Sequence, residues 1–468
     1  MTISYNRPTG EDIEFLRGII KDSERVLTGA EISEDYSHDE LGDIFVAPDV
    51  VVKVMSADEI VDIMRYANGN HIPVTPRGSG TGLVGASVAV EHGIMLDLSG
   101  MNRILELDKE NFTVTVEPGV LLLELAAYVE EQGFFYPPDP GEKTATIGGN
   151  INTNAGGMRA VKYGVTRDYV KGMDVVLADG EMISLGGKIV KNSSGYNLME
   201  LIIGSEGTLG IVTKAVLKLL PLPPRVISML IPFPDLESTV RTVPLIVASG
   251  AAPTAVEFME RGVITNAESY LGRKFPDNSA DAYLLLRFDG IMPDEINRRF
   301  DTVAEICLEN GALDVLISDT EDREDSIWKA RGAFLEAIKA GTTDIDEADI
   351  VVPRSHAAEM MLYAHSLQDE LGVRIEGFGH AGDGNVHIYL LRDDLAEEDW
   401  HNRLHAGMEK LYAKGRSLEG KTSGEHGIGW AKREYLKQDV SPREIKLMQA
   451  MKQVFDPNMI LNPGKVCW

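Results

Sequence analysis

Apolar positions in the first 220 residues recur at two spacings, one typical of helices and one typical of strands. The helix predicted at 58–68 places on one face Ile60, Ile63, Met64 and Ala67. A second helix is predicted at 121–132. Strands are predicted, from short apolar or alternating runs, at 72–75, 94–98 and 112–116. Further strands, separated by turns such as Asp179-Gly180, are predicted within 171–185 and 210–219. The first half of the chain is therefore expected to contain both helices and sheets.

The best linker candidate is the run Pro221-Leu222-Pro223-Pro224, because proline there interrupts any regular element. Beyond it the pattern changes to that of a second α+β domain. Its predicted strands and long helices lie at 227–231, 282–288, 295–310 and 325–340. From about Leu395 the pattern is helical. We therefore predict three parts, comprising residues 1–222, 223–394 and 395–468.

A glycine-rich run, residues 76–85, follows the strand predicted at 72–75. Successive small residues allow backbone N–H groups to point inward and hold a pyrophosphate. Residues 80–85 also satisfy the G-x-G-x-x-G pattern of a Rossmann site, which requires a helix directly afterwards. The residues that follow are typical of a strand, so the Rossmann match is predicted to be accidental.

Two further glycine clusters lie at 144–157 and 204–211. The first of these is too glycine-rich for a predicted helix and too patterned for a linker. One such loop is more often an ordinary turn than a phosphate site. Three within 135 residues favour a large cofactor held by backbone.

Histidines and a carboxylate occupy two short windows later in the chain, His380 to His387 and Gly424 to Gly427. Two imidazoles, one carboxylate and a spare imidazole are typical of a divalent-metal site with its own acid or base. Residues seven apart in a strand point to opposite faces, so His380 and His387 converge only if the turn at 382–384 redirects the chain. The alternative is two unrelated loops that each carry a surface histidine.

Composition narrows the classes of partner. The chain has 468 residues, 44% of them apolar and 25% charged, and a net charge of −28. Such acidity disfavours nucleic acid and anionic membranes as partners. The two cysteines, Cys307 and Cys467, are too few for an iron–sulfur cluster and fit a reducing compartment. With no apolar run long enough to span a bilayer, the expected location is the cytoplasm.

Together these motifs resemble the flavin-linked D-2-hydroxyacid dehydrogenase branch of the VAO/PCMH-type flavoproteins. That branch includes glycolate oxidase D subunits, D-lactate dehydrogenases and lactate dehydrogenase subunits that work with an electron-transfer flavoprotein. The resemblance runs from about Phe45 to Val466 and includes the closing Asn462-Pro463-Gly464-Lys465. It implies a two-subdomain PCMH-type FAD-binding domain at 1–222 and an α+β cap domain for the substrate at 223–394. A helical segment at 395–468 would return to the FAD domain.

The resemblance also implies which residues surround FAD. The pyrophosphate loop would comprise Pro76, Arg77, Gly78, Ser79, Gly80, Thr81, Gly82 and Leu83. The other portions of the cofactor would be lined by Pro138, Thr146, Ile147, Gly148, Gly149, Asn154, Gly156, Gly157, Glu206, Gly210 and Ile211. Relatives with covalent flavin carry a histidine in the first loop. Residues 76–85 contain none, so noncovalent FAD is expected.

The same resemblance assigns roles around a divalent metal, zinc or iron. His380, His387 and Glu425 would be its ligands, and His426 the general base. Arg331, expected at the start of a helix, would grip the substrate carboxylate, and Asn385 would add a polar contact. Enzymes for 2-hydroxyglutarate carry a lysine just before the position of Val351, and none stands there. A monocarboxylate such as lactate, with the D enantiomer favoured, or glycolate is therefore expected.

The implied reaction removes a hydride from Cα and a proton from the hydroxyl of a 2-hydroxyacid. FAD N5 is suited to the hydride, and a metal bound to the hydroxyl lowers the pKa of that group so that a histidine can take its proton. The electrons would pass to an external redox protein, an electron-transfer flavoprotein in preference to an iron–sulfur subunit.

Three other readings are open from the sequence. The chain could be a noncatalytic FAD-binding subunit of a glycolate-oxidase-like complex, although the complete histidine set disfavours that. An alkyl-dihydroxyacetone-phosphate synthase would show more histidines around residue 425. An NAD-dependent dehydrogenase would use the G-x-G-x-x-G run and would lack a flavin spectrum.

Overall fold

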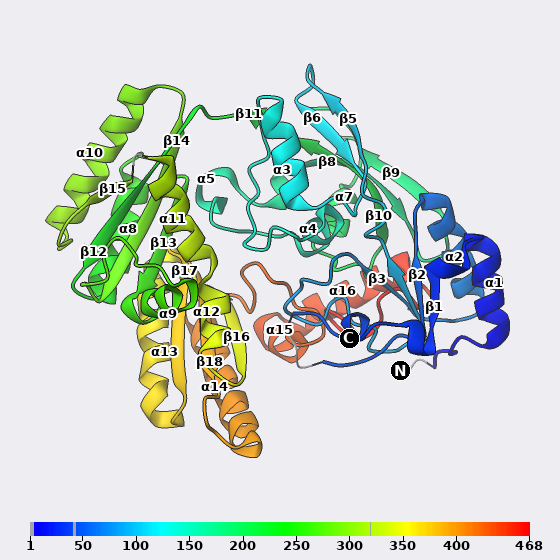
Figure 1. Ribbon diagram of the computed structural model, residues 1–468. Helices are drawn as coiled ribbons and strands as arrows, with labels where there is room; N and C mark the ends of the chain where they lie inside the picture. The colour runs from blue at the N-terminus through cyan, green and yellow to red at the C-terminus, as the bar shows by residue number, and fades with distance from the viewer. Residues whose placement is uncertain (1–3, 41–43, 319) are drawn as a thin grey trace. The chain divides into compact units, whose positions relative to one another are not determined.

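The computed structural model describes residues 4–40, 44–318 and 320–468. By its internal contacts the chain forms two compact units. The first unit comprises Met1–Ala155, Val165–Leu222 and Glu425–Trp468, and the second comprises Gly156–Gly164 and Pro223–Gly424. Figure 1 shows the elements of both units. None of the helices in the described ranges has the length and apolar character that a bilayer crossing needs.

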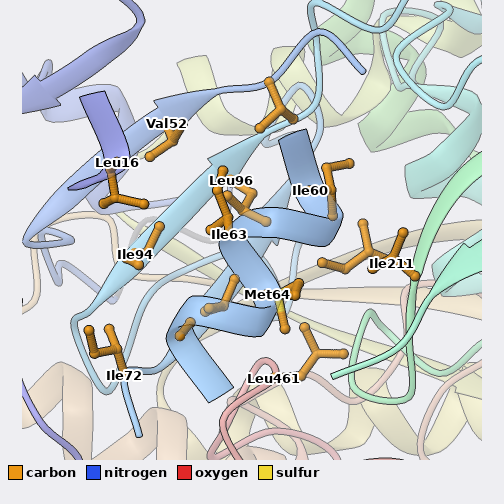
Figure 2. Packing of buried hydrophobic residues seen from close by; sticks show 14 of the residues in the cluster. Leu16, Val52, Ile60, Ile63, Met64, Ile72, Ile94, Leu96, Ile211 and Leu461 are labelled. Atoms are coloured by element: carbon orange, nitrogen blue, oxygen red, sulfur yellow. The ribbon is translucent and has the colours of Figure 1, made fainter. Parts of the chain in front are cut away.

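The first unit contains a four-stranded sheet in the order β1-β2-β4-β3. Its strands are β1 (Val26–Thr28), β2 (Val50–Lys53), β3 (Val74–Arg77) and β4 (Ile94–Asp97). β2, β4 and β3 run parallel. Helices α1 (Gly10–Ile20) and α2 (Ala57–Gly69) pack on this sheet through a shared apolar core (Figure 2).

The chain's last segment contributes to that same core. Leu461 is fully buried among the residues of α2 and the sheet (Figure 2). The N–H of Val74 donates to the carbonyl of Ile460 at 2.8 Å, and the N–H of Asn462 donates to the carbonyl of Val74 at 2.7 Å. The C-terminal segment therefore lies alongside β3, at the start of the first glycine loop.

A second, antiparallel sheet of the first unit has the order β5-β6-β10-β8-β9. Its strands are β5 (Ile104–Asp108), β6 (Thr113–Val116), β8 (Val170–Val176), β9 (Met182–Gly186) and β10 (Ile211–Lys218). The short strands β7 (Phe134–Phe135) and β11 (Leu220–Pro221) pair with each other. The remaining helices of the unit are α3 (Leu122–Glu131), α4 (Ile147–Thr153), α6 (Thr166–Tyr169), α7 (Met199–Ile202), α15 (Arg433–Asp439) and α16 (Pro442–Phe455).

The second unit is built on a seven-stranded antiparallel sheet in the order β15-β12-β14-β13-β17-β18-β16. The strands are β12 (Arg225–Phe233), β13 (Ala255–Glu260), β14 (Ala282–Gly290), β15 (Leu316–Ser318), β16 (Ile345–Val351), β17 (Arg374–His380) and β18 (Asn385–Leu391). Its helices are α5 (Ala160–Tyr163), α8 (Leu236–Ala248), α9 (Arg261–Leu271), α10 (Pro293–Glu309), α11 (Glu321–Gly332), α12 (Phe334–Ala340), α13 (Ala357–Leu371) and α14 (Glu397–Ser417). Helices α9, α11 and α12 share a core with the sheet.

The patterns predicted several elements correctly. Helix α2 buries the four residues expected of it, and no helix follows the first glycine loop, which confirms that the Rossmann match was accidental. The unit division at Leu222 falls in the predicted linker. The last segment grouped with the first unit begins at Glu425, and α14 packs against α13 and β16 of the second unit.

Two local predictions were wrong. The cluster at 144–157 does form a helix, α4, despite its glycines. Thr146 caps it by accepting a hydrogen bond from the N–H of Gly149 at 3.2 Å, and its apolar residues are buried, so packing overrides weak propensity. The helix predicted at 325–340 is two helices separated at Ala333, next to the poor helix former Gly332.

Candidate active site

The two histidines of the first window lie on adjacent strands of a tight hairpin. His380 ends β17, Asn385 begins β18, and these two residues are paired in the ladder. His387 is likewise paired with Phe378. Gly384 makes the turn with φ +87°, where a Cβ would collide with the carbonyl of Val352. Since paired residues share a face, the turn places both imidazoles on the same side of the sheet, as the sequence required for convergence.

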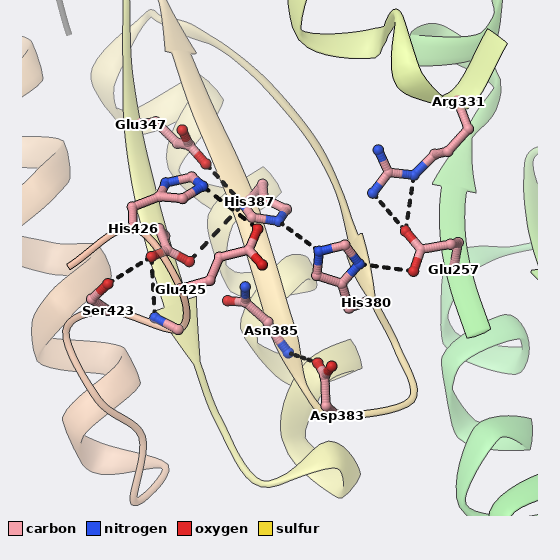
Figure 3. Close-up of polar contacts among 12 residues, drawn as sticks. Glu257, Arg331, Glu347, His380, Asp383, Asn385, His387, Ser423, Glu425 and His426 are labelled. Atoms are coloured by element: carbon pink, nitrogen blue, oxygen red, sulfur yellow. Dashed lines mark hydrogen bonds and ion pairs between the residues drawn. The ribbon is translucent and has the colours of Figure 1, made fainter. Parts of the chain in front are cut away.

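Each imidazole is oriented by a carboxylate, which is buried for His380 and partly buried for His387 (Figure 3). His380 Nδ1 lies 2.8 Å from Glu257 Oε1, and His387 Nδ1 lies 2.8 Å from Glu347 Oε1. The Nε2 atoms of the two rings face each other at 3.4 Å. The carboxylates accept Nδ1–H, so the lone pair of each ring is on Nε2. Two such lone pairs repel unless a cation or a shared proton lies between them, and carboxylate–histidine pairs of this kind are typical of metal ligands.

The carboxylates come from neighbouring strands of the same sheet. Glu257 on β13 is the ladder partner of His380, and Asp349 on β16 is the ladder partner of His387. Glu347 lies two residues before Asp349, on the same face of β16. Sequence reasoning missed all three acids. Their signal was an acidic residue inside an otherwise apolar strand, most clearly in Ala255–Glu260.

Arg331 lies in the last turn of α11, so the prediction that it starts a helix was wrong. Its Nε and Nη2 donate to Glu257 Oε2 at 2.9 and 2.5 Å, and its guanidinium lies 4.4 Å from the centre of the Phe378 ring. Burial alone would raise the pKa of the Glu257 carboxyl. The interactions with His380 and Arg331 outweigh burial and hold that pKa below its ordinary value. Glu257 is therefore an anion with two positively polarised neighbours.

Asn385 is buried, and its side-chain oxygen has no hydrogen-bond partner within the described part of the chain. Gly424 packs directly on this amide, where a Cβ would collide with it. The N–H of Gly424 and the hydroxyl of Ser423 donate to Asp349 Oδ2 at 3.1 and 2.8 Å. This fixes the end of the second unit beside the hairpin. Glu425 and His426 follow Gly424 directly in the chain and begin the last segment of the first unit.

The three glycine clusters of the first unit lie against one another. A Cβ on Gly78 would collide with Thr146, the cap of α4, and a Cβ on Gly207 would lie 2.7 Å from Pro76. The N–H groups of Glu206 and Gly207 donate to the carbonyl and side-chain oxygen of Asn152 at 2.7 and 3.1 Å. Backbone segments approach this closely only where side chains are absent. The three clusters therefore lie close together, as a large threaded cofactor needs.

Several predicted cofactor residues hold this surface in place with their side chains. Arg77 is buried and donates to the carbonyls of Asp35 and His38 at 2.7 and 2.8 Å. Glu206 accepts hydrogen bonds from the N–H groups of Ile428 and Gly429 at 2.7 and 2.6 Å, and burial raises the pKa of its carboxyl. These side chains are committed to the scaffold.

The remaining predicted cofactor residues are divided between exposed loop, buried loop and core. Ser79 is exposed, whereas Pro76, Gly78, Gly80, Thr81, Gly82 and Leu83 are partly buried. Buried positions are Pro138, Thr146, Ile147, Gly148, Gly210 and Ile211, with Gly149 partly buried. Asn154 ends α4 with φ +51°, and its side chain accepts from the N–H of Arg167 at 3.0 Å. Gly156 and Gly157 belong to the segment grouped with the second unit.

The closing motif ties the glycine loops together. The Lys465 ammonium donates to the carbonyls of Val88 and Ala86 at 2.5 and 3.2 Å, and burial lowers the pKa of this lysine to about 7. Asn462 donates to the carbonyls of Ala86 and Glu206 at 2.9 and 2.7 Å. The sequence singles out this motif, but its hydrogen-bond partners are distant in sequence and could not be predicted from it.

Comparison with known proteins matches both halves of the chain. Residues 222–466 match the family described as FAD linked oxidases, C-terminal domain, and residues 48–196 match the family described as FAD binding domain. The chain is 48% identical to a D-lactate dehydrogenase of Anaerostipes hadrus, over 99% of this chain and 98% of that one. It is 40% identical to glycolate oxidase subunit GlcD of Bacillus subtilis (strain 168), over 92% and 91%. A solved structure of p-cresol methylhydroxylase has a TM-score of 0.80 at 18% identity, covering 100% of this chain and 99% of that one, and this likeness concerns the fold alone.

Proposed function

The chain belongs to the FAD-linked oxidases and has their PCMH-type fold, and from that premise we propose that it oxidises a small 2-hydroxyacid to the 2-oxoacid. Relatives named for D-lactate and glycolate oxidation match nearly its whole length. It is accordingly an FAD-dependent hydroxyacid dehydrogenase. The finer assignment that we propose is a monocarboxylate substrate, D-lactate before glycolate.

FAD fits the first unit. The three glycine clusters pack against one another and carry few side chains, so a pyrophosphate and its flanking groups could approach their backbone closely. We propose that the residues of the 76–83 loop, of α4 and of the 204–211 cluster contact it noncovalently. When bound, FAD supplies the acceptor for the hydride from the substrate Cα.

A divalent metal is supported best by the two facing imidazole nitrogens. Their separation of 3.4 Å, with each Nδ1 held by a carboxylate, is the observation that carries the metal proposal. Glu425 directly follows Gly424, whose N–H donates to Asp349, and it can offer one further ligand atom. We propose that Glu425 completes the set of metal ligands. Nitrogen and oxygen donors of this kind suit zinc or iron.

Three residues have proposed roles toward the substrate. Arg331 would bind the substrate carboxylate with donors that it does not direct at Glu257, and Asn385 would direct its unsatisfied side-chain oxygen at a substrate donor. His426 would take the hydroxyl proton, while the hydride leaves from Cα. The acidic Glu347 and Asp349 near the hairpin disfavour a second carboxylate on the substrate, which fits a monocarboxylate.

We also propose an external redox protein as electron acceptor, an electron-transfer flavoprotein in preference to an iron–sulfur subunit. The two cysteines of the sequence, Cys307 and Cys467, are both buried and are too few for a cluster. Co-purification from the native host, followed by reduction of the partner's chromophore on adding hydroxyacid, tests this. Rapid direct reduction of NAD⁺ or oxygen by the isolated chain would contradict it.

The substrate proposal is tested with the FAD-loaded protein, a dye acceptor and a panel of D-lactate, L-lactate, glycolate and D-2-hydroxyglutarate. We expect the highest kcat/KM for D-lactate and the lowest for 2-hydroxyglutarate. A protein that binds FAD and turns over none of them would be the noncatalytic subunit instead. Preference for the dicarboxylate would overturn the monocarboxylate assignment.

A further inference from the structure

One buried carboxylate, that of Glu257, lies between two groups with different proposed tasks. It is on β13 with an exposed fraction of 0%. Its Oε1 faces His380 Nδ1, and its Oε2 accepts both hydrogen bonds from Arg331 (Figure 3). The ladder pairing of Glu257 with His380 fixes the first contact through the backbone. The second contact joins β13 to α11.

Both neighbours present donors, so the position requires a group that only accepts. The guanidinium of Arg331 has only donor groups and no acceptor atom. His380 must keep its proton on Nδ1 if Nε2 is to bind a metal. A carboxylate satisfies both with two separate oxygens. A glutamine can accept from only one of these two neighbours, because its NH₂ group must then face the other neighbour's donor.

We propose that Glu257 is a positioning residue shared by the metal site and the site for the substrate carboxylate. It holds the tautomer of His380 with one oxygen and the direction of the Arg331 guanidinium with the other. Metal affinity and substrate affinity are thereby linked through one side chain. This inference rests on the proposed function, since it takes His380 as a ligand and Arg331 as the carboxylate-binding residue.

The consequence can be worked out for Glu257→Gln. The amide oxygen turns to the charged Arg331, and the NH₂ group faces His380 Nδ1. That ring then takes the other tautomer and carries its proton on Nε2, the atom that faces His387 at 3.4 Å. Loss of a group that orients a metal ligand typically lowers metal affinity about 10–100-fold. The altered guanidinium should also raise the KM for the hydroxyacid.

The chain offers a matched control in Glu347, which makes the corresponding 2.8 Å contact with His387. Glu347→Gln disturbs the second imidazole and leaves the bonds between Glu257 and Arg331 intact. A double variant, Glu257→Gln with Arg331→Met, provides a rescue. Without the guanidinium, the amide oxygen is free to turn to His380 and restore the tautomer that binds metal.

The experiment uses FAD-loaded protein and measures Zn²⁺ affinity by competition with a chromophoric chelator, and KM for D-lactate at saturating Zn²⁺. We expect Glu257→Gln to lose about 10–100-fold in Zn²⁺ affinity and to raise KM. Glu347→Gln should lose Zn²⁺ affinity with KM close to that of the wild type. The double variant should regain most of the Zn²⁺ affinity and keep the high KM.

The outcomes distinguish failure of the metal proposal from failure of the role proposed for Glu257. Wild-type protein that binds no Zn²⁺, Fe²⁺ or Mn²⁺ overturns the metal proposal and this inference with it. Wild-type binding with an unchanged Glu257→Gln variant overturns the shared role of Glu257 alone, as does a double variant that recovers no affinity. If Glu257→Gln does not retain FAD, the double variant, which has no unpaired guanidinium, decides the question by the same two measurements.

Discussion

Gly148, in the first turn of α4, offers a sharp test of how the flavin site is built. It is buried, its N–H donates to the carbonyl of Pro118 at 2.7 Å, and a Cβ there would lie 2.6 Å from the Pro118 Cβ. The same Cβ would lie 3.1 Å from the Pro118 carbonyl oxygen. The residue that excludes a side chain is therefore Pro118, in addition to any cofactor that approaches the backbone.

The size of the effect of Gly148→Ala follows from these contacts. Ordinary carbon–carbon contacts need about 3.5 Å or more, so α4 and Pro118 must separate by roughly 1 Å. Overpacking of a buried site typically costs about 1–3 kcal/mol. If that strain is expressed in the FAD-bound state, the dissociation constant for FAD rises about 5–150-fold, since about 1.4 kcal/mol is a factor of ten. Gly148→Val should have a larger effect.

The assay is titration of the apoprotein with FAD, followed by flavin fluorescence. The control is Gly18→Ala in α1, also a helical glycine, where a Cβ would meet nothing within 4 Å. That variant should bind FAD as the wild type does and be more stable by about 0.5–1 kcal/mol. If Gly148→Ala binds FAD with wild-type affinity, α4 is not part of the flavin site, and the reasoning fails.

Three further predictions concern the cofactor, the histidines and pH. Acid or heat denaturation should release FAD into the supernatant, and flavin retained on the denatured chain would contradict noncovalent binding. His380→Ala and His387→Ala should lose bound metal, whereas His426→Ala should keep FAD and metal and lose kcat. Near wild-type rates in all three variants would disprove the site. The hydrogen bond of His365 with Glu260, at 2.9 Å, raises the pKa of His365, so its stabilising contribution is complete below about pH 6.5 and is lost as pH rises through the raised pKa. His365→Gln should remove that part of the pH dependence, about 1 kcal/mol or less for this partly exposed pair, in unfolding measurements across this range.

Periodicity predicted the elements whose burial is set locally. Helix α2 is an example, because its four apolar positions alone decide which face packs on the sheet. Periodicity failed where contacts with residues distant in sequence decide whether an element forms. Helix α4 forms because Thr146 caps it and Gly148 packs on Pro118, and neither contact appears in the glycine pattern.

The residues of the candidate site show the same difference between local signals and distant partners. The histidines could be found from the sequence because a glycine turn between them is a local signal. Glu257 and Glu347 stand out in the sequence only as acidic residues in apolar strands, and which histidine each one meets depends on the order of the sheet. Likewise the scaffold roles of Arg77 and Glu206 depend on carbonyl and N–H groups from distant segments.

The central claim is that FAD oxidises a hydroxyacid with help from a metal held by His380 and His387. Its most direct test is anaerobic mixing of the FAD-loaded protein with D-lactate while the visible flavin absorbance is recorded, before and after metal removal by a chelator. The account predicts rapid bleaching of the flavin before chelation, none on the same timescale with FAD still bound after it, and recovery when Zn²⁺ or Fe²⁺ is restored. Bleaching at the same rate in the chelated protein, or none with any 2-hydroxyacid in the metal-loaded protein, would contradict it.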